Sequence, residues 1–267
     1  MKIGFIGGGN MGEAIISALL DKAICAAAEI TVSDISPQRR EALARRYGIA
    51  TTDDNRAAVG AAEVIVIAVK PQNVAEVLPG LRGALRPPQL ALSIMAGINL
   101  TTLRDGLDYP AVVRVMPNTP AQVGVGMSAW TASPEVTAPQ RAWAEAILGA
   151  MGKEIYLADE AGIDMATAVS GSGPAYVFLL AEAMTQAGEA IGLSPEVALE
   201  LAIQTVFGAA TYLRQSDKPP AELRRLVTSP HGTTAAALDE LTAGGFSGLM
   251  KRAIAAAHRR ARELGGS

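Results

Sequence analysis

A turn near the carboxyl end of the chain holds residues suited to binding a small anion. They are Ser229, Pro230, His231, Gly232, Thr233 and Thr234. Proline and glycine are typical of a tight turn, and the first N–H groups of the helix that follows have no intrahelical partner. Together with the Ser and Thr hydroxyls, these groups form an anion receptor without formal charge, suited to a small carboxylate. An ordinary Ser/Thr helix cap is the alternative interpretation.

The other end of the chain carries a glycine pattern typical of dinucleotide binding. Gly7, Gly9 and Gly12 are spaced as G-x-G-x-x-G, after a strand-like run and before a helical one. The first glycine permits a tight turn, the second lets the backbone approach a pyrophosphate, and the third lets helix and strand pack closely. We therefore predict that this loop binds a dinucleotide at a helix N-terminus. A flexible turn without a ligand is the alternative.

The segment after the second predicted strand bears on the choice of cofactor. Asp34 could accept a hydrogen bond from a ribose 2′-hydroxyl, as in NAD, whereas Arg39 or Arg40 could hold the 2′-phosphate of NADP. Asp34 could instead cap the next helix. These features indicate different cofactors, so the residues alone leave the choice open.

Two further strand ends carry polar residues. Lys70 follows the third predicted strand, with Pro71 forcing a turn, and Asn118 follows the fifth between two prolines. The carboxyl ends of parallel strands meet at one edge of a sheet, so we expect these residues to converge on one crevice. A solvated loop position is an equally good interpretation of Lys70.

The elements that must position these residues are predicted from apolar runs. Strands are expected at residues 2–6, 29–33, 63–69, 90–95 and 111–116, with edge strands at 127–132 and 154–157. Their alternation with helical stretches is typical of a parallel, doubly wound α/β sheet. Ser36 before Pro37 predicts a capped helix start, and Thr137 with Gln140 predicts a capping box.

Beyond about residue 158 the strand-like runs stop and long helical runs follow. We therefore predict a Rossmann-like dinucleotide-binding domain over residues 1–158 and an all-helical substrate-binding and dimerisation domain over residues 159–267. A Gly/Ser turn at 170–173 should lead into a buried helix, and residues 244–250 should precede the last helix. The helices from Ala175 to Leu213 are too apolar for one subunit to bury, so we expect a second subunit to cover them.

Composition argues against several classes of partner. The net charge of −3 disfavours nucleic acid and anionic membranes, and the apolar runs are too short to span a bilayer. Cys25 has no second cysteine to pair with, and two histidines are too few for a zinc site, so we expect no disulfide and no metal. The chain opens with strand-like residues rather than a signal peptide. We expect a cytoplasmic protein with neither a membrane nor a nucleic-acid partner.

Four motifs in chain order resemble those of the pyrroline-5-carboxylate reductase family: GFIGGGNMGEAI, AVKPQ, SGSGPAY and LVTSPHGTTAAALDEL. The resemblance implies hydride transfer from NADPH, or from NADH, to the C=N carbon of 1-pyrroline-5-carboxylate. The product is L-proline, in the last step of proline biosynthesis. The resemblance also implies a homodimer, which in this family often assembles further into a decamer. The cofactor carries the hydride, and an iminium carbon is already electrophilic, so a strong acid or a metal is unnecessary.

The resemblance also implies roles for particular residues. The substrate carboxylate should lie against residues 229–234, and the Thr234 hydroxyl should hydrogen-bond the ring nitrogen as the catalytic contact. This family usually has two consecutive glycines where the present chain has His231 and Gly232, so a positive φ at the first position would strain the histidine. From the glycine loop and the resemblance together, we predict cofactor contacts at Ile6, Gly7, Gly8, Gly9, Asn10, Met11, Gly12, Asp34, Ser36, Asn55, Ala68, Val69, Lys70, Pro71 and Ala96.

Two other functions compete with this one. β-Hydroxyacid dehydrogenases have a similar glycine loop, but they use a lysine early in the helical domain as acid and base. The present chain has no lysine between Lys153 and Lys218, so that reaction would lack its proton carrier. A non-catalytic nucleotide sensor would keep the loop, but it would not need a carboxylate-binding turn.

Overall fold

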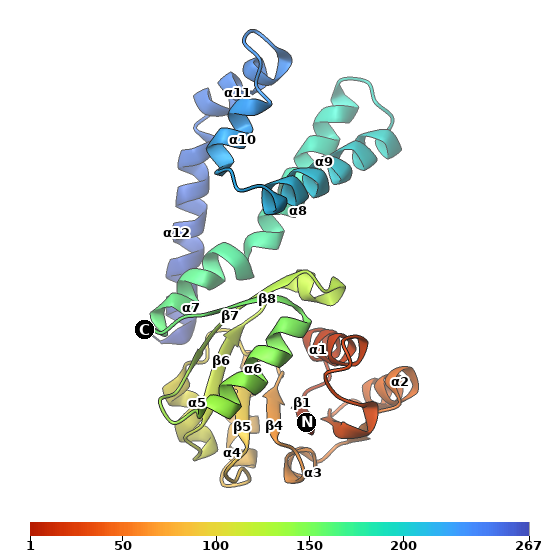
Figure 1. Cartoon of the computed structure of the whole chain (residues 1–267), viewed down its shortest axis with the longest axis vertical. Coiled ribbons are helices and arrows are strands. Elements are labelled where there is room, and N and C mark those ends of the chain that lie inside the picture. The colour runs from red at the N-terminus through yellow and green to blue at the C-terminus, as the bar shows by residue number, and fades with distance from the viewer. Residues whose placement is uncertain (267) are drawn as a thin grey trace. The chain divides into compact units, whose positions relative to one another are not determined.

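The computed structural model describes residues 1–266, which divide into two compact units. The first unit joins Met1–Ser172 with the segment from Ala257 onward, and the second is Gly173–Ala256. The strands belong to the first unit, and the second is built of helices and turns (Figure 1).

The first unit is built on an eight-stranded sheet with strands β1 (Ile3–Ile6), β2 (Ile30–Ser33), β3 (Ala50–Thr52), β4 (Val64–Ile67), β5 (Leu90–Ser93), β6 (Val112–Met116), β7 (Gly126–Ala132) and β8 (Gly152–Tyr156). Their order is β3-β2-β1-β4-β5-β6-β7-β8, and every neighbouring pair is parallel except β6 with β7. All residues of β1, β4 and β5 are buried, as expected of strands covered on both faces. The predicted doubly wound α/β class is confirmed.

Two features of this sheet differ from the prediction. The sequence analysis does not predict β3, because its three residues are exposed or half-buried and contain no apolar run. Lys70 consequently follows the fourth strand rather than the third. The second difference concerns β7, which was expected at an edge but pairs on both sides, with β6 and with β8. The edge position belongs to β8.

Helices cover both faces of the sheet. They are α1 (Asn10–Asp21), α2 (Pro37–Tyr47), α3 (Asn55–Gly60), α4 (Val74–Leu81), α5 (Leu100–Leu107), α6 (Ala138–Ala150) and α7 (Ala161–Ala166), with short helical turns η1 (Ala27–Glu29), η2 (Pro71–Asn73), η3 (Thr119–Val123) and η4 (Thr167–Gly171). Helix α1 packs beside α6, whereas α3, α4 and α5 pack in series on the other face (Figure 1).

The predicted helix starts have the expected capping residues. Ser36 Oγ accepts a hydrogen bond from the N–H of Arg39 at 3.3 Å, and Pro37 is the first helical residue of α2. At the start of α6, the N–H of Thr137 donates to Gln140 Oε1 at 2.8 Å. The Thr137 hydroxyl lies 3.0 Å from the same oxygen, and Thr137 and Gln140 form the predicted capping box.

Apolar side chains on both faces of the central strands form the core of this unit. Phe5, Ile15 and Ile65 are fully buried in it. Burial of one such side chain contributes roughly 1.5–3 kcal/mol to the free energy of unfolding. The core therefore holds the ends of the central strands at fixed positions.

A buried arginine links the sheet to the helix that follows the last strand. Arg114 on β6 is 4% exposed, and its guanidinium donates to Asp164 on α7 at 2.7 Å and to Glu160 at 3.0 Å. The same Glu160 oxygen accepts the N–H of Leu100, the first residue of α5, at 2.8 Å. Arg114 therefore joins segments that are far apart in the chain. These ion pairs attach α7 to the first unit, although α7 follows residue 158 in the chain. The predicted domain boundary at residue 158 stays a prediction.

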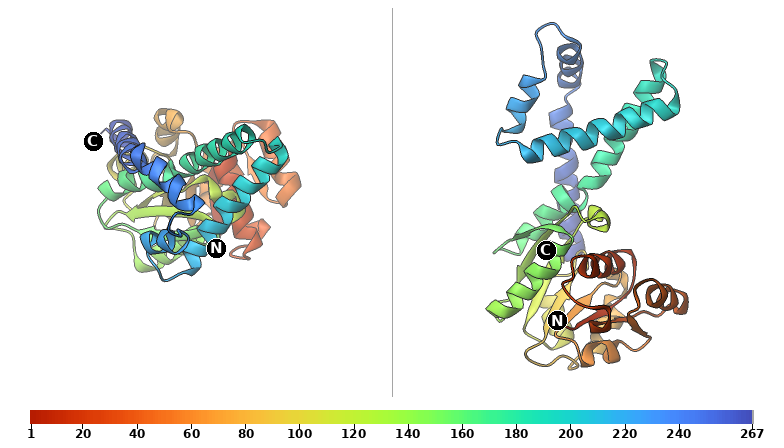
Figure 2. Two further views of the ribbon diagram at one scale, coloured as in Figure 1. Left: turned by 90° about the horizontal axis from the view of Figure 1, so that it is seen from above. Right: turned by 45° about the vertical axis from the view of Figure 1, so that its right-hand side comes forward.

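The second unit consists of α8 (Gly173–Ala190), α9 (Pro195–Gln215), α10 (Pro220–Leu226), α11 (Thr233–Ala243) and the first turns of α12 (Phe246–Gly265). Helices α8 and α9 form a hairpin (Figure 2). A Cβ on Gly188 would lie 3.0 Å from that of Ala198, so glycine lets the two helices approach closely. Residues 246–250 begin α12 instead of preceding it as predicted.

This unit has almost no core of its own. Among its described residues, the buried apolar side chains are Ala198, Ala202 and Leu223. Phe178 is 66% exposed and Phe207 is 64% exposed. The prediction that α8 is buried is therefore wrong within one chain, because nothing in residues 1–266 covers it. Such a large exposed apolar surface is typical of a subunit interface.

We expect the protein to be a dimer joined through α8 and α9. The double variant Phe178→Glu/Phe207→Glu should sediment as a monomer, because the dimer interface would have to bury two unpaired charges. As a control, Ile35→Glu changes an apolar residue of the first unit that is 86% exposed, and it should leave the dimer intact. A folded, active wild-type monomer at micromolar concentration would contradict this expectation.

We also expect Asp164→Asn to lower the free energy of unfolding by about 3 kcal/mol, because it removes the more deeply buried of the two carboxylates that compensate the Arg114 guanidinium. Denaturant unfolding followed by circular dichroism measures this loss. Glu135→Gln, which removes the partner of half-exposed Arg104 at 2.8 Å, is the matched control and should cost under about 1 kcal/mol. Equally small losses in both variants would show that the charge of Asp164 is not needed.

Candidate active site

The carboxyl ends of four parallel strands meet at one edge of the sheet. At this edge the N–H of Gly7 donates to the Ser33 carbonyl at 2.7 Å, and the N–H of Ala68 donates to the Ile6 carbonyl at 2.8 Å. The N–H of Ile94 donates in turn to the Ile67 carbonyl at 3.1 Å. The ends of β1, β2, β4 and β5 are thus joined directly. The residues predicted to contact the cofactor lie in or just after these strand ends, apart from Asn55, which begins α3.

The glycine loop has the shape that a dinucleotide needs. Gly7 has φ +97°, and a Cβ there would lie 2.9 Å from the Ala68 carbonyl oxygen. A Cβ on Gly12 would lie 2.8 Å from the Gly7 carbonyl oxygen, so α1 and the loop touch. Gly9, by contrast, is exposed and has no neighbouring atom within 4 Å of a Cβ position. The loop therefore combines a tight turn, a close helix contact and one open stretch of backbone that a pyrophosphate can approach.

The second residue of the loop packs against the protein. A Cβ on Gly8 would lie 2.6 Å from Leu43 Cδ1, and the Gly8 N–H donates to Asp34 Oδ2 at 2.8 Å. The other oxygen of Asp34 accepts the N–H of Ser36 at 2.9 Å. Asp34 thus connects the glycine loop to the turn after β2, while the side-chain cap of α2 is Ser36.

The two arginines near this loop already have partners. Arg40 donates to the Asp34 carbonyl at 2.7 Å and lies 3.6 Å from Asp53. Arg39 donates through Nε to the Gly8 carbonyl and through one terminal nitrogen to Glu13. Glu13, in α1, is a residue that the sequence analysis missed. An acidic residue early in a phosphate-binding helix is unfavourable for the ligand, and that conflict could have drawn attention to it.

Glu13 is the centre of a charged cluster. Its other carboxylate oxygen accepts Arg46 at 3.0 Å and the Tyr47 hydroxyl at 3.1 Å. Burial raises the pKa of Glu13, but hydrogen bonds from Arg39 and Tyr47 and the two arginine charges outweigh burial and lower the pKa below its ordinary value. A cavity of about 210 Å³ lies beside the cluster, between α1, α2 and η3.

The polar residues after the other strands differ in their surroundings. Asn55 Oδ1 accepts the Ser33 hydroxyl at 2.7 Å. Lys70 is exposed and, within residues 1–266, forms no ion pair. Asn118 accepts the N–H of Met127 at 2.9 Å and donates to the carbonyl and hydroxyl of Ser170 at 3.3 Å. Asn118 thus links β7 to η4. The Lys70 side chain, by contrast, forms no hydrogen bond or ion pair within residues 1–266.

The proposed carboxylate turn lies in the second unit, at the start of α11. Gly232 is the residue before the helix, and no side chain caps it. Within residues 1–266, the hydroxyls of Ser229, Thr233 and Thr234 make no hydrogen bond to protein. The Ser/Thr helix-cap interpretation is therefore wrong, and the donors of this turn are available to a ligand.

The residue that departs from the family pattern is strained as anticipated. His231 has φ +59°, in the left-handed region that favours glycine. The next residue, Gly232, has φ −83°, but a Cβ there would lie 2.3 Å from Ser229 Oγ. The two positions thus favour glycine for different reasons, the first for its backbone angle and the second for space.

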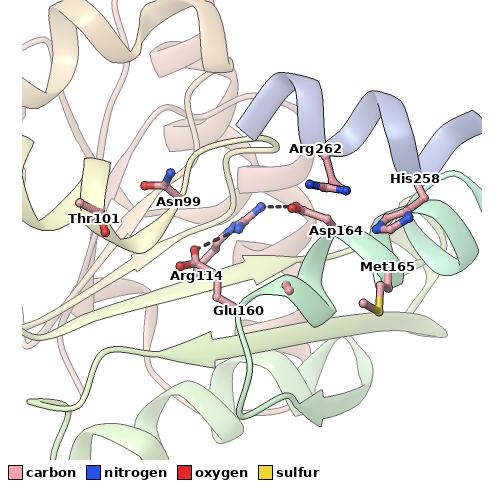
Figure 3. Close-up of a pocket in the computed structure, with 9 residues that line it drawn as sticks. Asn99, Thr101, Arg114, Glu160, Asp164, Met165, His258 and Arg262 are labelled. Carbon is pink, nitrogen blue, oxygen red and sulfur yellow. Dashed lines mark hydrogen bonds and ion pairs between the residues drawn. The ribbon is translucent and has the colours of Figure 1, made fainter. Parts of the chain in front are cut away.

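A larger cavity of about 440 Å³ lies away from the glycine loop. Figure 3 shows Arg114 pointing toward Asp164 and Glu160, with His258 and Arg262 of α12 lining the other side. The cavity contains no residue of the predicted cofactor or substrate sets. Its lining residues are Asn99, Thr101, Arg114, Glu160, Ala161, Asp164, Met165, His258 and Arg262.

No group of three His, Cys, Asp or Glu side chains within residues 1–266 is placed to hold a metal ion. Over the same residues, no helix combines the length and apolar character that crossing a bilayer requires.

Comparison with known proteins gives matches along the whole chain. The family model for pyrroline-5-carboxylate reductase dimerisation matches residues 160–264, and the model described as NADP oxidoreductase coenzyme F420-dependent matches residues 2–97. The pyrroline-5-carboxylate reductase of Pseudomonas aeruginosa is 47% identical over 264 residues, which cover 98% of this chain and 96% of the relative. That of Synechocystis is 41% identical and covers 99% of this chain and 98% of the relative.

Solved structures agree with these sequence matches. The pyrroline-5-carboxylate reductase of Coxiella burnetii superposes with a TM-score of 0.93 at 37% identity, covering 98% of each chain. The Plasmodium falciparum pyrroline carboxylate reductase, solved with NADP bound, gives a TM-score of 0.89 at 30% identity and covers 99% of this chain and 98% of its own. From the sequence matches over its full length and the shared fold, this chain belongs to the pyrroline-5-carboxylate reductase family.

Proposed function

We propose that this protein reduces 1-pyrroline-5-carboxylate to L-proline, the last step of proline biosynthesis, with NADPH as the preferred reductant and NADH as a second. The observation that carries this proposal is the turn at residues 229–234, where the hydroxyls of Ser229, Thr233 and Thr234 and the N–H groups of Thr233 and Thr234 form no hydrogen bond within residues 1–266. Relatives named for this activity match the chain over nearly its whole length, which supports the same assignment.

The cofactor would lie along the edge formed by β1, β2, β4 and β5. When bound, the reduced nicotinamide supplies the hydride. The chain's own part would be to orient it: Gly9, Asn10 and Met11 offer backbone N–H groups at the start of α1, where the helix dipole favours phosphate. Asp34, Ser36 and Arg39 surround the expected position of the adenosine ribose. The remaining proposed contacts are Ile6, Gly7, Gly8, Gly12, Asn55, Ala68, Val69, Lys70, Pro71 and Ala96.

The substrate would bind at the turn before α11. Its carboxylate is suited to the free N–H groups of Thr233 and Thr234 and to the Ser229 hydroxyl, which supply hydrogen bonds without a formal charge. The Thr234 hydroxyl would hydrogen-bond the ring nitrogen. With the ring nitrogen protonated as an iminium, the carbon is already electrophilic and the proton stays on nitrogen as hydride arrives, so this hydroxyl supplies only a hydrogen bond and neither a carboxylic acid nor a lysine is needed.

Assembly and location complete the proposal. The dimerisation model covers residues 160–264, which supports the exposed apolar helices as the subunit interface. We further propose that these dimers assemble into a decamer, as the family resemblance implies. We also propose a cytoplasmic location, without a nucleic-acid or membrane partner, and the single free cysteine, Cys25, is compatible with a reducing compartment.

Thr234→Val tests the assignment of the turn. This change removes the hydroxyl and keeps the shape of the side chain, so kcat should fall at least tenfold while KM changes less. The variant should remain a folded dimer, because no side chain in this turn caps α11. Stopped-flow or steady-state measurement of NADPH oxidation gives both constants.

The matched control is the neighbouring residue. Thr233→Val keeps the N–H assigned to the substrate carboxylate and removes the hydroxyl beside it, so any effect should fall on KM more than on kcat. If Thr234→Val kept its normal kcat, the hydroxyl would have no part in turnover and the assignment would be wrong.

A further inference from the structure

We infer that Glu13 is a positioning residue for NADPH selectivity: it holds Arg39 so that one edge of the guanidinium stays free for the 2′-phosphate of the cofactor. The inference rests on the proposed function only in taking a nicotinamide dinucleotide as the ligand of the glycine loop. Glu13 itself would not touch the cofactor.

The first observation is how the Arg39 guanidinium is used. Its Nε donates to the Gly8 carbonyl and its Nη2 donates to Glu13, and the arginine side chain is 27% exposed. Nε and Nη2 share one edge of the planar guanidinium. Within residues 1–266, Nη1 forms no hydrogen bond. The edge formed by Nη1 and Nη2 is therefore free, and that geometry suits two parallel hydrogen bonds to a phosphate.

The second observation is that Glu13 is itself held in place. It lies on α1, is 19% exposed, and receives Arg46 at 3.0 Å and the Tyr47 hydroxyl at 3.1 Å from α2. Burial, together with the Glu13 carboxylate, outweighs the lowering by Ser17 and Arg46 and raises the pKa of Tyr47 above its ordinary value, so its hydroxyl remains a donor. With these contacts on one oxygen, the other oxygen is directed at Arg39.

The third observation concerns charge at the ribose end of the loop. The Asp34 carboxylate accepts N–H groups of Gly8 and Ser36, and its negative charge disfavours a 2′-phosphate. A flexible arginine would offset that charge only weakly, because ordering a long side chain costs conformational entropy. An arginine already fixed by Glu13 and the Gly8 carbonyl avoids this cost, and this favours NADPH over NADH.

Equilibrium binding of NADP⁺ and NAD⁺ to the dimer tests the inference without turnover. Glu13→Gln should lower the ratio of NADP⁺ to NAD⁺ affinity roughly tenfold, because the charge-assisted bond to Arg39 is lost. Removing a negative charge beside the loop favours the pyrophosphate of either dinucleotide equally, so the ratio isolates the 2′-phosphate.

Two further variants make the test specific. Arg46→Gln removes an exposed partner of the other Glu13 oxygen, which the Tyr47 hydroxyl still holds, and should change the ratio by less than about twofold. In an Arg39→Ala background, Glu13→Gln should no longer alter the ratio, since Glu13 acts through Arg39. Thermal melting of each variant confirms that it is folded.

An unchanged or higher ratio in Glu13→Gln would overturn the inference, and a higher one would mean that Glu13 competes with the phosphate for Arg39. An effect that persists in the Arg39→Ala background would also overturn it. Failure of the proposed function has a different signature, because the wild-type protein would then bind neither dinucleotide or would form no proline.

Discussion

The reversal of the chain at Gly7 is the constraint on which the candidate cofactor site depends. β1 is fully buried between β2 and β4, so the chain must turn within a few residues to begin α1 at the sheet edge. The Gly7 N–H donates to the Ser33 carbonyl at the end of β2. Gly7 has φ +97°, and a Cβ there would lie 2.9 Å from the Ala68 carbonyl oxygen after β4. Any side chain at Gly7 would separate β1 from the end of β4. The open backbone at Gly9 and the N-terminus of α1 are positioned by this turn.

The proposed cofactor-binding loop and the proposed substrate-binding turn solve different physical problems. Around the glycine loop, charged groups partner one another: Asp34 accepts two N–H groups, and Arg39 is shared between Gly8 and Glu13. The turn before α11 instead carries no carboxylate, and its hydroxyls are unbonded within the described residues. His231 stays there in a left-handed conformation that costs a non-glycine residue about 1–2 kcal/mol. Strain of this size persists where the surrounding structure determines the backbone, as it commonly does at ligand sites.

Sequence alone predicted the features that depend on local pattern. The strands at Ile3–Ile6 and Val64–Ile67 are uninterrupted apolar runs, and the cap at Ser36 is a local signal. The positive φ of His231 was anticipated from the glycine usually found at that position in the family. Features that depend on distant partners were missed. β3 is too short to show a pattern, the pairing of β7 on both sides is set by β8, and Glu13 gained its role only when α2 placed arginines beside it. α8 looks like a core helix in sequence, and its covering surface lies outside the single chain.

The central claim is that this chain transfers hydride from a nicotinamide to the C=N carbon of 1-pyrroline-5-carboxylate. Incubating the protein with the substrate and NADPH deuterated at the transferred position of the nicotinamide, followed by mass spectrometry of the products, tests it directly. The account predicts L-proline carrying one deuterium, located on the ring carbon that was double-bonded to nitrogen, in an amount equal to the NADPH consumed. Proline without the label, or loss of NADPH without proline, would contradict it.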